Sequence, residues 1–570
     1  MNGRPERAQQ PERAQRPERA QRPERAQRPE PLARRTSPWV VAATAAVAAF
    51  AIAVTGCAPA APPASNVLVR GNGPEPDSLD PQKARSVEAH VVLRDLYECL
   101  TSLAKDASTA PGVAKSWDVS SDGRIYTFHL RDNARWSNGD RVTSDDFVFA
   151  LRRLVDPTTA SQYAQLIDVV ENAGAIVAGR AAPETLGVSA PDPLTVVVRL
   201  AAPAPYLPGL LSFPSTCPVH RPTLAREGER FTKPGVMVSN GAFVLTDWTP
   251  GVGITVTRNR QYWNDAATRL DGVRYLQIAD ESTEFTRYRA GDLHVTAVVP
   301  RAQYDIIRRD YAAELHVAPQ LSTYYYGFAL DRAPFRDAPG LRRALSLVID
   351  REQLARAVLR VGELPAYGWI PPGVHDYTAQ QFDYAGRPMT ERIAEARRLY
   401  AAAGYSATRP LRFELRYNSG EVHSRLAVAI AAMWKEALGV EAQLTAVEFR
   451  SLMADIDARN VEMFRMSWSG DYNDAYTFLQ YLKSDFGINL PRYANPAYDA
   501  LLARASATVD PAARRALLEQ AERTMLADTP LLPLYFYVNK HLVSPRVEGW
   551  YDNVLNVVYS KDLALRPLPR

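Results

Sequence analysis

The sequence predicts a mixed α/β body built on several sheets and preceded by an N-terminal segment that does not belong to it. Short strand patterns alternate with amphipathic helix patterns from about residue 67 to the C-terminus. Hydrophobic residues make up 46% of the chain and charged residues 23%, which is typical of a soluble globular protein. A chain of 570 residues is too long for one core, so two or more domains are expected.

The individual elements follow from hydrophobic period and from capping residues. Strands are predicted at 67–70, 126–131, 195–200, 253–258, 273–278 and 411–417. Helices are predicted at 147–154, 341–349, 390–403 and 423–438, with an N-cap for the first in Thr143–Asp146. Gly404 and Gly439 are the expected C-caps of the last two helices.

Residues 1–38 are a low-complexity tail in which the unit Arg-Pro-Glu-Arg-Ala-Gln recurs. With almost no apolar residues to bury, this tail is predicted to be disordered. It carries ten Arg and five Glu, so the +4 formal net charge of the chain arises here and the body is close to neutral. A neutral body argues against nucleic acid as a partner. A basic tail could lie on an anionic membrane, but we favour an extended signal n-region or a start codon placed too far upstream.

Residues 39–57 have the parts of an export signal. An uncharged apolar run from Trp39 to Val54 follows Arg34 and Arg35 and ends in Val-Thr-Gly-Cys. This ending resembles a bacterial lipobox, in which Cys57 would be acylated and become the first residue of the mature chain. The alternative is an uncleaved anchor, although the run is short for a spanning helix. Residues 58–66 are a small, Pro-rich spacer.

No pattern for catalysis or for a cofactor is present. The sequence has no HExxH, no Walker lysine loop and no G-x-S-x-G, and its eight His are scattered without metal-ligand spacing. None of the three cysteines is in a CxxC pair. With Cys57 used for lipid, Cys99 and Cys217 could form a disulfide or remain two buried thiols, and the sequence does not decide between them. We expect a binding protein that has no cofactor or metal and is not an enzyme.

The segment 465–474 is the most informative candidate site. A strand pattern ends there in a Gly-containing turn with Asp471 between Trp468 and Tyr472. An Asp in a turn is commonly a turn former, but in a water-poor cleft it could pair with a cationic amine. Aromatic side chains nearby would supply rigid walls for such a cleft.

Several motifs together resemble the family 5 extracellular solute-binding proteins, and within them the oligopeptide-binding branch. The resemblance covers about residue 67 to the C-terminus. The segments that carry it are Pro-Asp-Ser-Leu-Asp-Pro at 76–81, the runs 111–118, 126–131, 136–139 and 145–147, and the branch-specific runs 156–161, 240–243, 323–326, 365–368, 471–473 and 533–539.

This resemblance implies a periplasmic-binding-protein-like fold (type II, cluster C), with two lobes that close over a cleft and an extra domain. Lobe I would comprise 67–97, 222–321 and 541–570, the extra domain 98–221, and lobe II 322–540. It also implies a monomer, lipid-anchored in the periplasm or cell envelope. That monomer would capture short peptides and deliver them to an inner-membrane ABC permease and its ATPases.

The resemblance also assigns roles to residues. Asp471 matches the carboxylate that receives the peptide's amino terminus. Arg465 and His423 match residues near peptide carboxyl ends, although a structural ion pair and a helix N-terminal contact are their respective alternatives. Trp468 and Tyr325 match cavity-wall positions. The peptide main chain would pair with the backbone of Arg85, Ser86 and Val87 on one side and of Ser467, Trp468 and Ser469 on the other.

The chain departs from the family pattern at four positions. Ser322 and Ser469 stand where relatives have a disulfide, and Ile456 and Leu359 stand where relatives have basic residues. Arg360 and Arg459 are close enough in sequence to substitute, and we expect a changed preference for peptide length. The alternative cargoes within the same fold are dipeptides, murein peptides, haem, nickel chelates and sugars. An adhesive or sensing lipoprotein and a hydrolase are alternatives of other classes.

Overall fold

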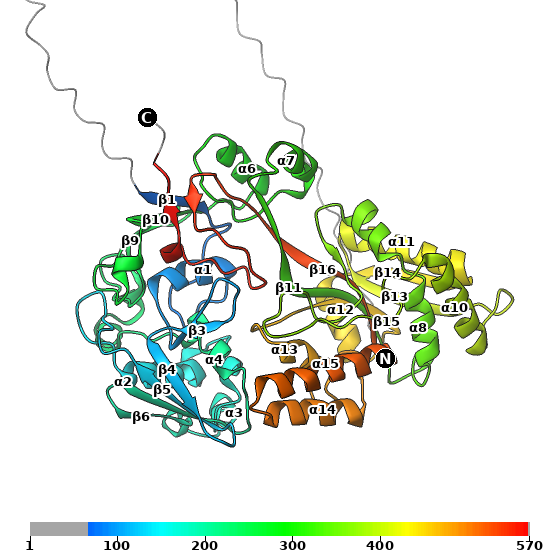
Figure 1. Ribbon diagram of the computed structural model, residues 1–570, viewed down its shortest axis with the longest axis horizontal. Coiled ribbons are helices and arrows are strands. Elements are labelled where there is room, and N and C mark those ends of the chain that lie inside the picture. Colours follow the sequence, from blue (N-terminus) through cyan, green and yellow to red (C-terminus); the bar gives the residue numbers. More distant parts are fainter. Residues whose placement is uncertain (1–65, 568–570) are drawn as a thin grey trace, which may run out of the picture. The chain divides into compact units, whose positions relative to one another are not determined.

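The structure is a computed structural model that describes residues 66–567 (Figure 1). The predicted tail 1–38, the signal 39–57 with Cys57, and all of the spacer 58–66 except its last residue lie outside the described residues. None of the helices described is long and apolar enough to cross a membrane.

The first sheet has four strands in the order β1 (Val67–Gly71), β10 (Gly272–Leu276), β9 (Gly253–Arg258) and β8 (Phe243–Thr249). β1 runs parallel to β10, and the other pairs are antiparallel. The predicted strands 67–70, 253–258 and 273–278 are confirmed, with shifts of one or two residues at their ends. β1 stays paired with β10 up to Gly71, and the residues at its C-terminal end and just after it line a cavity.

The second sheet is antiparallel, in the order β4 (Ala114–Val119), β5 (Ile125–Leu130), β7 (Thr195–Arg199) and β6 (Val188–Asp192). Helix α2 (Ser144–Val155) packs on this sheet and begins three residues before the predicted start. The earlier start has a local cause, since the Thr143 N–H donates to the Asp146 carboxylate at 2.8 Å and so caps the first turn.

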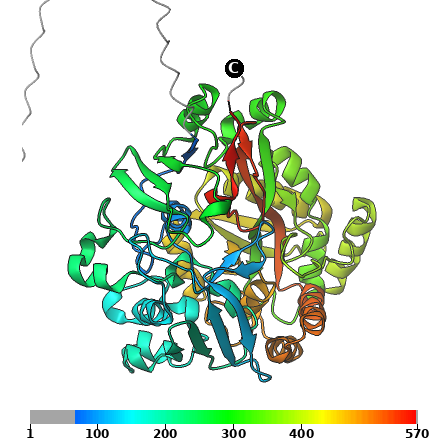
Figure 2. The same cartoon turned by 60° about the vertical axis from the view of Figure 1, so that its left-hand side comes forward.

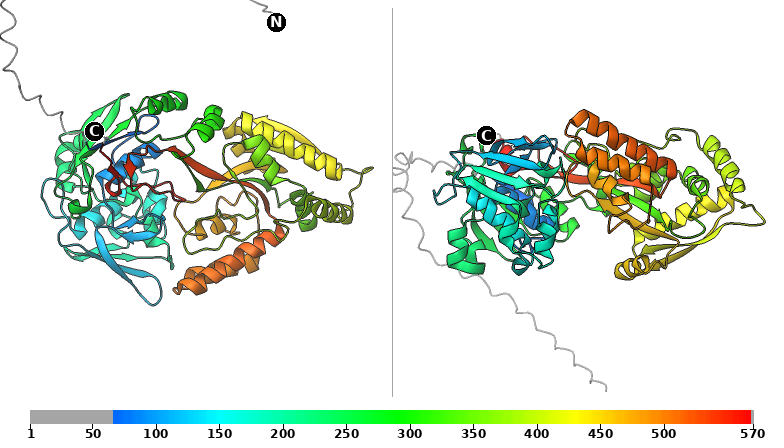
Figure 3. Two further views of the ribbon diagram at one scale, coloured as in Figure 1. Left: turned by 45° about the horizontal axis from the view of Figure 1, so that its top comes forward. Right: turned by 90° about the horizontal axis from the view of Figure 1, so that it is seen from below.

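The third sheet has six strands in the order β12 (Leu364–Pro365), β16 (Leu531–Leu542), β11 (Leu315–Phe328), β15 (Met463–Ser469), β13 (Arg412–Asn418) and β14 (Glu441–Val447). Its helices are α8 (Pro339–Leu347), α10 (Met389–Ala402), α11 (Glu421–Leu438), α12 (Phe449–Asp457), α14 (Pro496–Ala507) and α15 (Pro511–Asp528). Helices α14 and α15 lie side by side, as Figure 3 shows from below. Gly439 ends α11 with φ +75°, as predicted.

The remaining helices and strands lie between or beside these sheets. They are α1 (Val87–Leu96), β2 (Thr101–Leu103), β3 (Thr109–Pro111), α3 (Ala173–Val177), α4 (Leu207–Leu210), α5 (Arg221–Glu227), α6 (Glu281–Arg289), α7 (Tyr304–Asp310), α9 (Arg351–Gln353), α13 (Tyr476–Leu479), β17 (Val547–Glu548) and β18 (Ala564–Leu565).

The long strands β11 and β16 run side by side in Figure 1 and Figure 2, from the region of α6 and α7 into the third sheet. Their antiparallel pairing shifts register between Pro319 and Thr323. Pro319, which has no N–H to donate, is still in register with Val538 and is the last such residue before the interruption. The two strands therefore connect two parts of the body through a pairing that is locally irregular.

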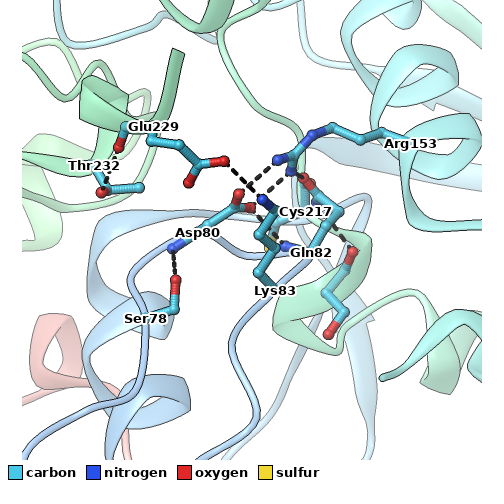
Figure 4. A network of polar contacts seen from close by, with 9 residues as sticks. Ser78, Asp80, Gln82, Lys83, Arg153, Cys217, Glu229 and Thr232 are labelled. Atoms are coloured by element: carbon cyan, nitrogen blue, oxygen red, sulfur yellow. Dashed lines mark hydrogen bonds and ion pairs between the residues drawn. The ribbon is translucent and has the colours of Figure 1, made fainter. Parts of the chain in front are cut away.

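A buried polar network explains one motif on which the family resemblance rests (Figure 4). The guanidinium of Arg153, on α2, donates to both oxygens of Asp80 at 2.7 and 2.5 Å and to Gln82 at 2.6 Å. The amide of Gln82 in turn donates to the carbonyls of Ser215 and Cys217 at 3.1 and 3.0 Å. The motif thus joins three segments that are distant in sequence, and Asp80 has a structural role here.

Cys99 and Cys217 form a disulfide, which settles the alternative that the sequence left open. Both cysteines are buried, and the bond links the start of β2 to the segment that leads into α5.

Replacing both cysteines by serine is expected to lower the free energy of unfolding. The bond closes a loop of 118 residues, and the chain-entropy relation gives a loss of about 4–5 kcal/mol for a loop of that length. Urea unfolding of the oxidised protein and of the Cys99→Ser/Cys217→Ser variant would measure the difference, with reduced wild type as the control. Equal midpoints for the oxidised protein and the variant would contradict the expectation.

Candidate ligand-binding cleft

A cavity of about 760 Å³ lies where segments from distant parts of the sequence converge. Its lining comes from the end of β1, from α1, from the segment around α4, from the loop after β15 and from the segments that follow β16. A space of this size holds a ligand of several residues.

The loop Ser469–Asp474 forms one wall of the cavity, and its residues have separate structural roles. A Cβ at Gly470 would meet the side chains of Leu321 and Thr477 at 2.6 and 2.7 Å, so glycine lets these two side chains pack against the loop. The amide of Asn473 donates to the carbonyl of Ala107 at 2.9 Å, and Asp474 forms an ion pair with Arg514 at 2.7 Å. These contacts fix the loop and leave Asp471 facing the cavity.

Asp471 has no Lys, Arg or His ion-pair partner among residues 66–567. Its backbone N–H is held by the Thr477 hydroxyl at 3.2 Å, while its carboxylate opens onto the cavity. The surrounding protein desolvates this carboxylate and raises its pKa above the ordinary value. A ligand ammonium would supply the missing counter-charge.

Aromatic rings line the cavity beside this loop. Tyr472 stacks on Tyr206 with 4.6 Å between ring centroids, and Tyr163 packs on Phe213 at 4.9 Å. His90 lies edge-on to Phe213 at 4.8 Å, and burial lowers its pKa to about 4, so it is neutral at pH 7. These packed rings give the cavity a rigid aromatic wall beside the loop.

Strand β15 has an unpaired edge that leads into this loop. On one side β15 pairs with β11 along its whole length, but on the other side β13 pairs only with Met463 and Phe464. The bonds from Gly470 N to Leu321 O and from Ala329 N to Glu462 O set the alternation of the β11–β15 ladder. By that alternation the backbone N–H and C=O of Ser467 and Ser469 point away from β11, toward the unpaired edge.

The segment Arg85–Val87 presents a second set of backbone groups. Asp77 accepts hydrogen bonds from the N–H groups of Arg85 and Ser86 at 2.9 and 3.0 Å, and Ser86 is the N-cap of α1. The Arg85 carbonyl and the Val87 N–H have no backbone partner in the described chain. Two groups at positions i and i+2 are the pair that a parallel strand uses. Val87 is 70% exposed and lines the cavity.

Arg465 and His423 lie together in a second cluster, outside the residues that line the cavity. Arg465 is 7% exposed, lies 4.4 Å over the Tyr324 ring and donates to Asn418 at 2.9 Å. It forms no ion pair within residues 66–567, so the alternative role as a structural ion pair has no partner in the described chain. His423, in the first turn of α11, shares a hydrogen bond of 3.1 Å with the Tyr324 hydroxyl.

The resemblance implies that Trp468 and Tyr325 form the cavity wall, but neither residue lines the 760 Å³ cavity. Tyr325 is fully buried, edge-on to Trp369 at 5.2 Å and hydrogen-bonded to the Tyr481 hydroxyl, and it does not line the 760 Å³ cavity. Trp468 is partly buried, and its indole N–H donates to the Thr477 carbonyl at 2.9 Å. Both side chains support the strand and the loop that carry the cleft.

The departures from the family pattern also have defined places. The hydroxyls of Ser322 and Ser469 hydrogen-bond to each other at 2.9 Å across the β11–β15 pair. Ile456 and Leu359 are both buried in the core at 2% exposure. Arg360 and Arg459 pair with Asp305 and Asp331 at 2.8 and 3.7 Å, so their charges are already partnered.

Sequence reasoning missed much of the lining, notably Arg70, His90, Tyr163, Tyr206 and Phe213. These residues lie on β1, on α1 and in the predicted extra domain, where no local pattern distinguishes them from core residues. Among residues 66–567 no three His, Cys, Asp or Glu gather into a possible metal site.

Comparisons with known proteins identify the class. Residues 108–489 match the model of the bacterial extracellular solute-binding proteins, family 5 Middle. The chain is 39% identical to the periplasmic oligopeptide-binding protein OppA of Escherichia coli K12, over 85% of this chain and 89% of that protein. It is 38% identical to a probable deoxycholate-binding periplasmic protein, YgiS, of the same organism, over 93% and 98% of the two chains.

A solved structure agrees in fold. The unliganded open form of the periplasmic murein tripeptide-binding protein MppA matches with a TM-score of 0.84 and 37% identity, over 88% of this chain and 98% of that one. The chain belongs to the family 5 extracellular solute-binding proteins, and the predicted periplasmic-binding-protein-like α/β fold is confirmed.

Replacing Arg465 by methionine is expected to raise the pKa of His423. Burial and the nearby Arg465 charge lower this pKa from 6.5 to about 4, with burial the larger cause. Removal of the charge should therefore raise the pKa but leave it below 6.5. Proton NMR titration of the His ring signals would measure the change, with the His423→Gln variant used for assignment and His316 as the internal control. An unchanged pKa would show that the charge of Arg465 does not lower the pKa of His423.

Proposed function

We propose that this protein captures short peptides in the 760 Å³ cleft as the substrate-binding component of an ABC importer. The observation that carries the proposal is the unpaired edge of β15 ending beside Asp471, a carboxylate that lines the cavity and has no cation paired with it among residues 66–567. An extended peptide would add to the edge through Ser467 and Ser469 and place its amino terminus on Asp471. The relatives that bind oligopeptides and murein tripeptides, at 37–39% identity, support this choice.

On the opposite side of the peptide we propose pairing with the Arg85 carbonyl and the Val87 N–H. Main-chain bonds on both sides would be independent of the ligand's side chains, so one cleft would accept many sequences. The Arg465–His423 cluster would then receive the carboxyl end of peptides long enough to reach it. Because Ile456 and Leu359 are apolar and buried, we propose a length preference that differs from that of relatives with basic residues there.

We propose that binding closes two lobes over the peptide. The lobes would be 67–97 with 222–321 and 541–570, and 322–540, with 98–221 as the extra domain. Both proposed boundaries between the lobes fall inside or at the end of β11 and β16, and the register shift at Pro319–Thr323 is a natural place for bending. The structure resembles the unliganded open form of MppA, which supports the proposal that this protein is open when no ligand is bound.

The cargo is the point on which relatives differ. YgiS carries the name of a deoxycholate-binding protein, and a bile acid has no ammonium group to pair with Asp471. A carboxylate without a partner cation, at the end of an unpaired sheet edge, favours a peptide. We further propose that the protein acts as a monomer without catalysis and delivers its cargo to a membrane permease with separate ATPases.

We also propose export and lipid attachment at Cys57, which would hold the protein in the periplasm or cell envelope. Incorporation of labelled fatty acid into the wild type, and its loss in Cys57→Ala, would test the attachment. An unlabelled wild-type protein in the membrane fraction would indicate an uncleaved anchor instead.

Native mass spectrometry of the purified protein, followed by denaturation and sequencing of what is released, tests the cargo directly. Peptides of a few residues would support the proposal, and their lengths would report what Ile456 and Leu359 changed. A bound bile acid or other small solute would overturn the proposal that the cargo is a peptide. If the protein is empty, a thermal-shift screen with peptides decides the matter, and no stabilisation by any peptide would overturn it.

Replacing Asp471 by asparagine is expected to weaken peptide binding at least about tenfold, the loss expected for one charge-assisted hydrogen bond. Calorimetry with a tripeptide and with its N-acetylated form would measure this. The acetylated peptide should bind the wild type weakly and be indifferent to the substitution. Asp485→Asn, an exposed residue paired with Lys483, is the matched control. If Asp471→Asn weakened the binding of both peptides equally, the peptide amino terminus would not lie on Asp471.

A further inference from the structure

Arg70 is a buried cation at the edge of the cleft. It is the penultimate residue of β1, where it pairs with Tyr275 of β10, and its guanidinium lies 5.9 Å from the centre of the Tyr275 ring. The residue is 8% exposed and lines the 760 Å³ cavity. The pairing of β1 fixes its backbone, so this side chain is held in position by the sheet.

No acidic residue within 66–567 forms an ion pair with Arg70, and its Nε is buried without a hydrogen-bond partner. The acidic side chains nearest in the fold are already occupied. Asp95 accepts from the Tyr275 hydroxyl and from the Ser560 N–H at 3.1 Å. Glu284 accepts from the N–H groups of Ala297 and Val298 at 2.8 and 3.4 Å.

A second unpartnered donor lines the same cavity. The side-chain amide nitrogen of Asn539, on β16, is buried without a hydrogen-bond partner. His541, two residues further along β16, is not available to it or to Arg70, because its ring nitrogens contact the Thr296 carbonyl at 2.9 Å and Asn556 at 2.7 Å. Arg70 and Asn539 are thus two of the buried donors without acceptors that line this cavity, and Arg94 Nε and the Tyr472 hydroxyl are others.

Arg70 interacts with Asp95 and Glu284 only through longer-range electrostatics. A buried guanidinium N–H and a buried amide N–H that lack hydrogen-bond acceptors both destabilise a folded protein. Such groups are expected where a ligand supplies the acceptor. The guanidinium fork matches the two oxygens of a carboxylate, which can accept from it through parallel bonds. An amide nitrogen adds a further donor without adding charge.

We propose that Arg70 and Asn539 form a carboxylate-binding subsite of the cleft, separate from Asp471 and from the Arg465–His423 cluster. This subsite rests on the proposed peptide-binding function and adds to it a preference for peptides with a carboxylate that reaches β1. That carboxylate belongs either to an acidic side chain or to the carboxyl terminus of a short peptide.

Calorimetry on the full chain with four tripeptides, each with a free amino terminus, separates the two sources. The peptides are Ala-Glu-Ala and Ala-Gln-Ala, each with a free and with an amidated carboxyl end. Arg70→Met is expected to weaken at least one carboxylate-bearing peptide about tenfold or more and the amidated Ala-Gln-Ala less than about twofold. A loss on amidated Ala-Glu-Ala identifies a side chain, and a loss on free Ala-Gln-Ala that vanishes on amidation identifies the terminus.

Two further variants control for folding and for general charge. Arg70→Lys keeps the charge without the fork and should weaken binding less than Arg70→Met. Arg274→Met removes an exposed arginine from the adjacent strand β10, which does not line the cavity, and should change no affinity. A melting temperature of Arg70→Met that is not lower than that of the wild type would show that the variant folds.

Equal effects of Arg70→Met on all four peptides, or no effect on any, would overturn the subsite while leaving peptide binding in place. A variant that unfolds at a markedly lower temperature would also overturn it, because Arg70 would then be a structural residue. If none of the four peptides binds the wild type, the proposed function itself is wrong.

Discussion

β11 hydrogen-bonds to β16 along one edge and to β15 along the other, and most of the cleft depends on this arrangement. The pairing with β15 positions the loop that carries Asp471 and directs the free backbone groups of Ser467 and Ser469 away from β11. The pairing with β16 brings Asn539 to the cavity. Successive side chains of β11 point to opposite faces of the sheet, so Tyr325 lies on one face and Tyr324 and Tyr326 lie on the other.

The cleft combines two kinds of recognition. In the proposed binding mode, backbone groups of a sheet edge and of the segment before α1 would contact the main chain that every peptide has. Asp471 would contact the amino terminus, and Arg70 would contact a carboxylate that only some ligands place there. A receptor built this way can be broad in sequence and still select for charge and for length, because the two tasks lie on different atoms.

Much of the fold followed from the sequence because strand and helix periods are local properties. The strands at 253–258 and 411–417 and the helix that ends at Gly439 were predicted within one or two residues. The candidate loop was found because Gly470, Asp471 and Tyr472 are adjacent in sequence.

Other parts of the site could not be predicted locally. Arg70, Tyr163 and Tyr206 come from separate segments, and only tertiary packing brings them to one cavity. The same limit applies to the disulfide between Cys99 and Cys217, which depends on a separation in space that a spacing of 118 residues does not reveal. Tyr325 shows the opposite case, in which a resemblance suggested a cavity wall and strand alternation buried the ring against Trp369 and Tyr481.

The unpaired edge of β15 also bears on how the protein avoids sticking to its neighbours. An exposed strand edge is a template for association with any other sheet, and many proteins cover such edges or place charges on them. Here the edge ends at Ser469 in the wall of a cavity of about 760 Å³, a space too small for a folded sheet. At this end of β15 the cavity limits by size what can pair with the free backbone donors and acceptors, which on an open surface would promote aggregation.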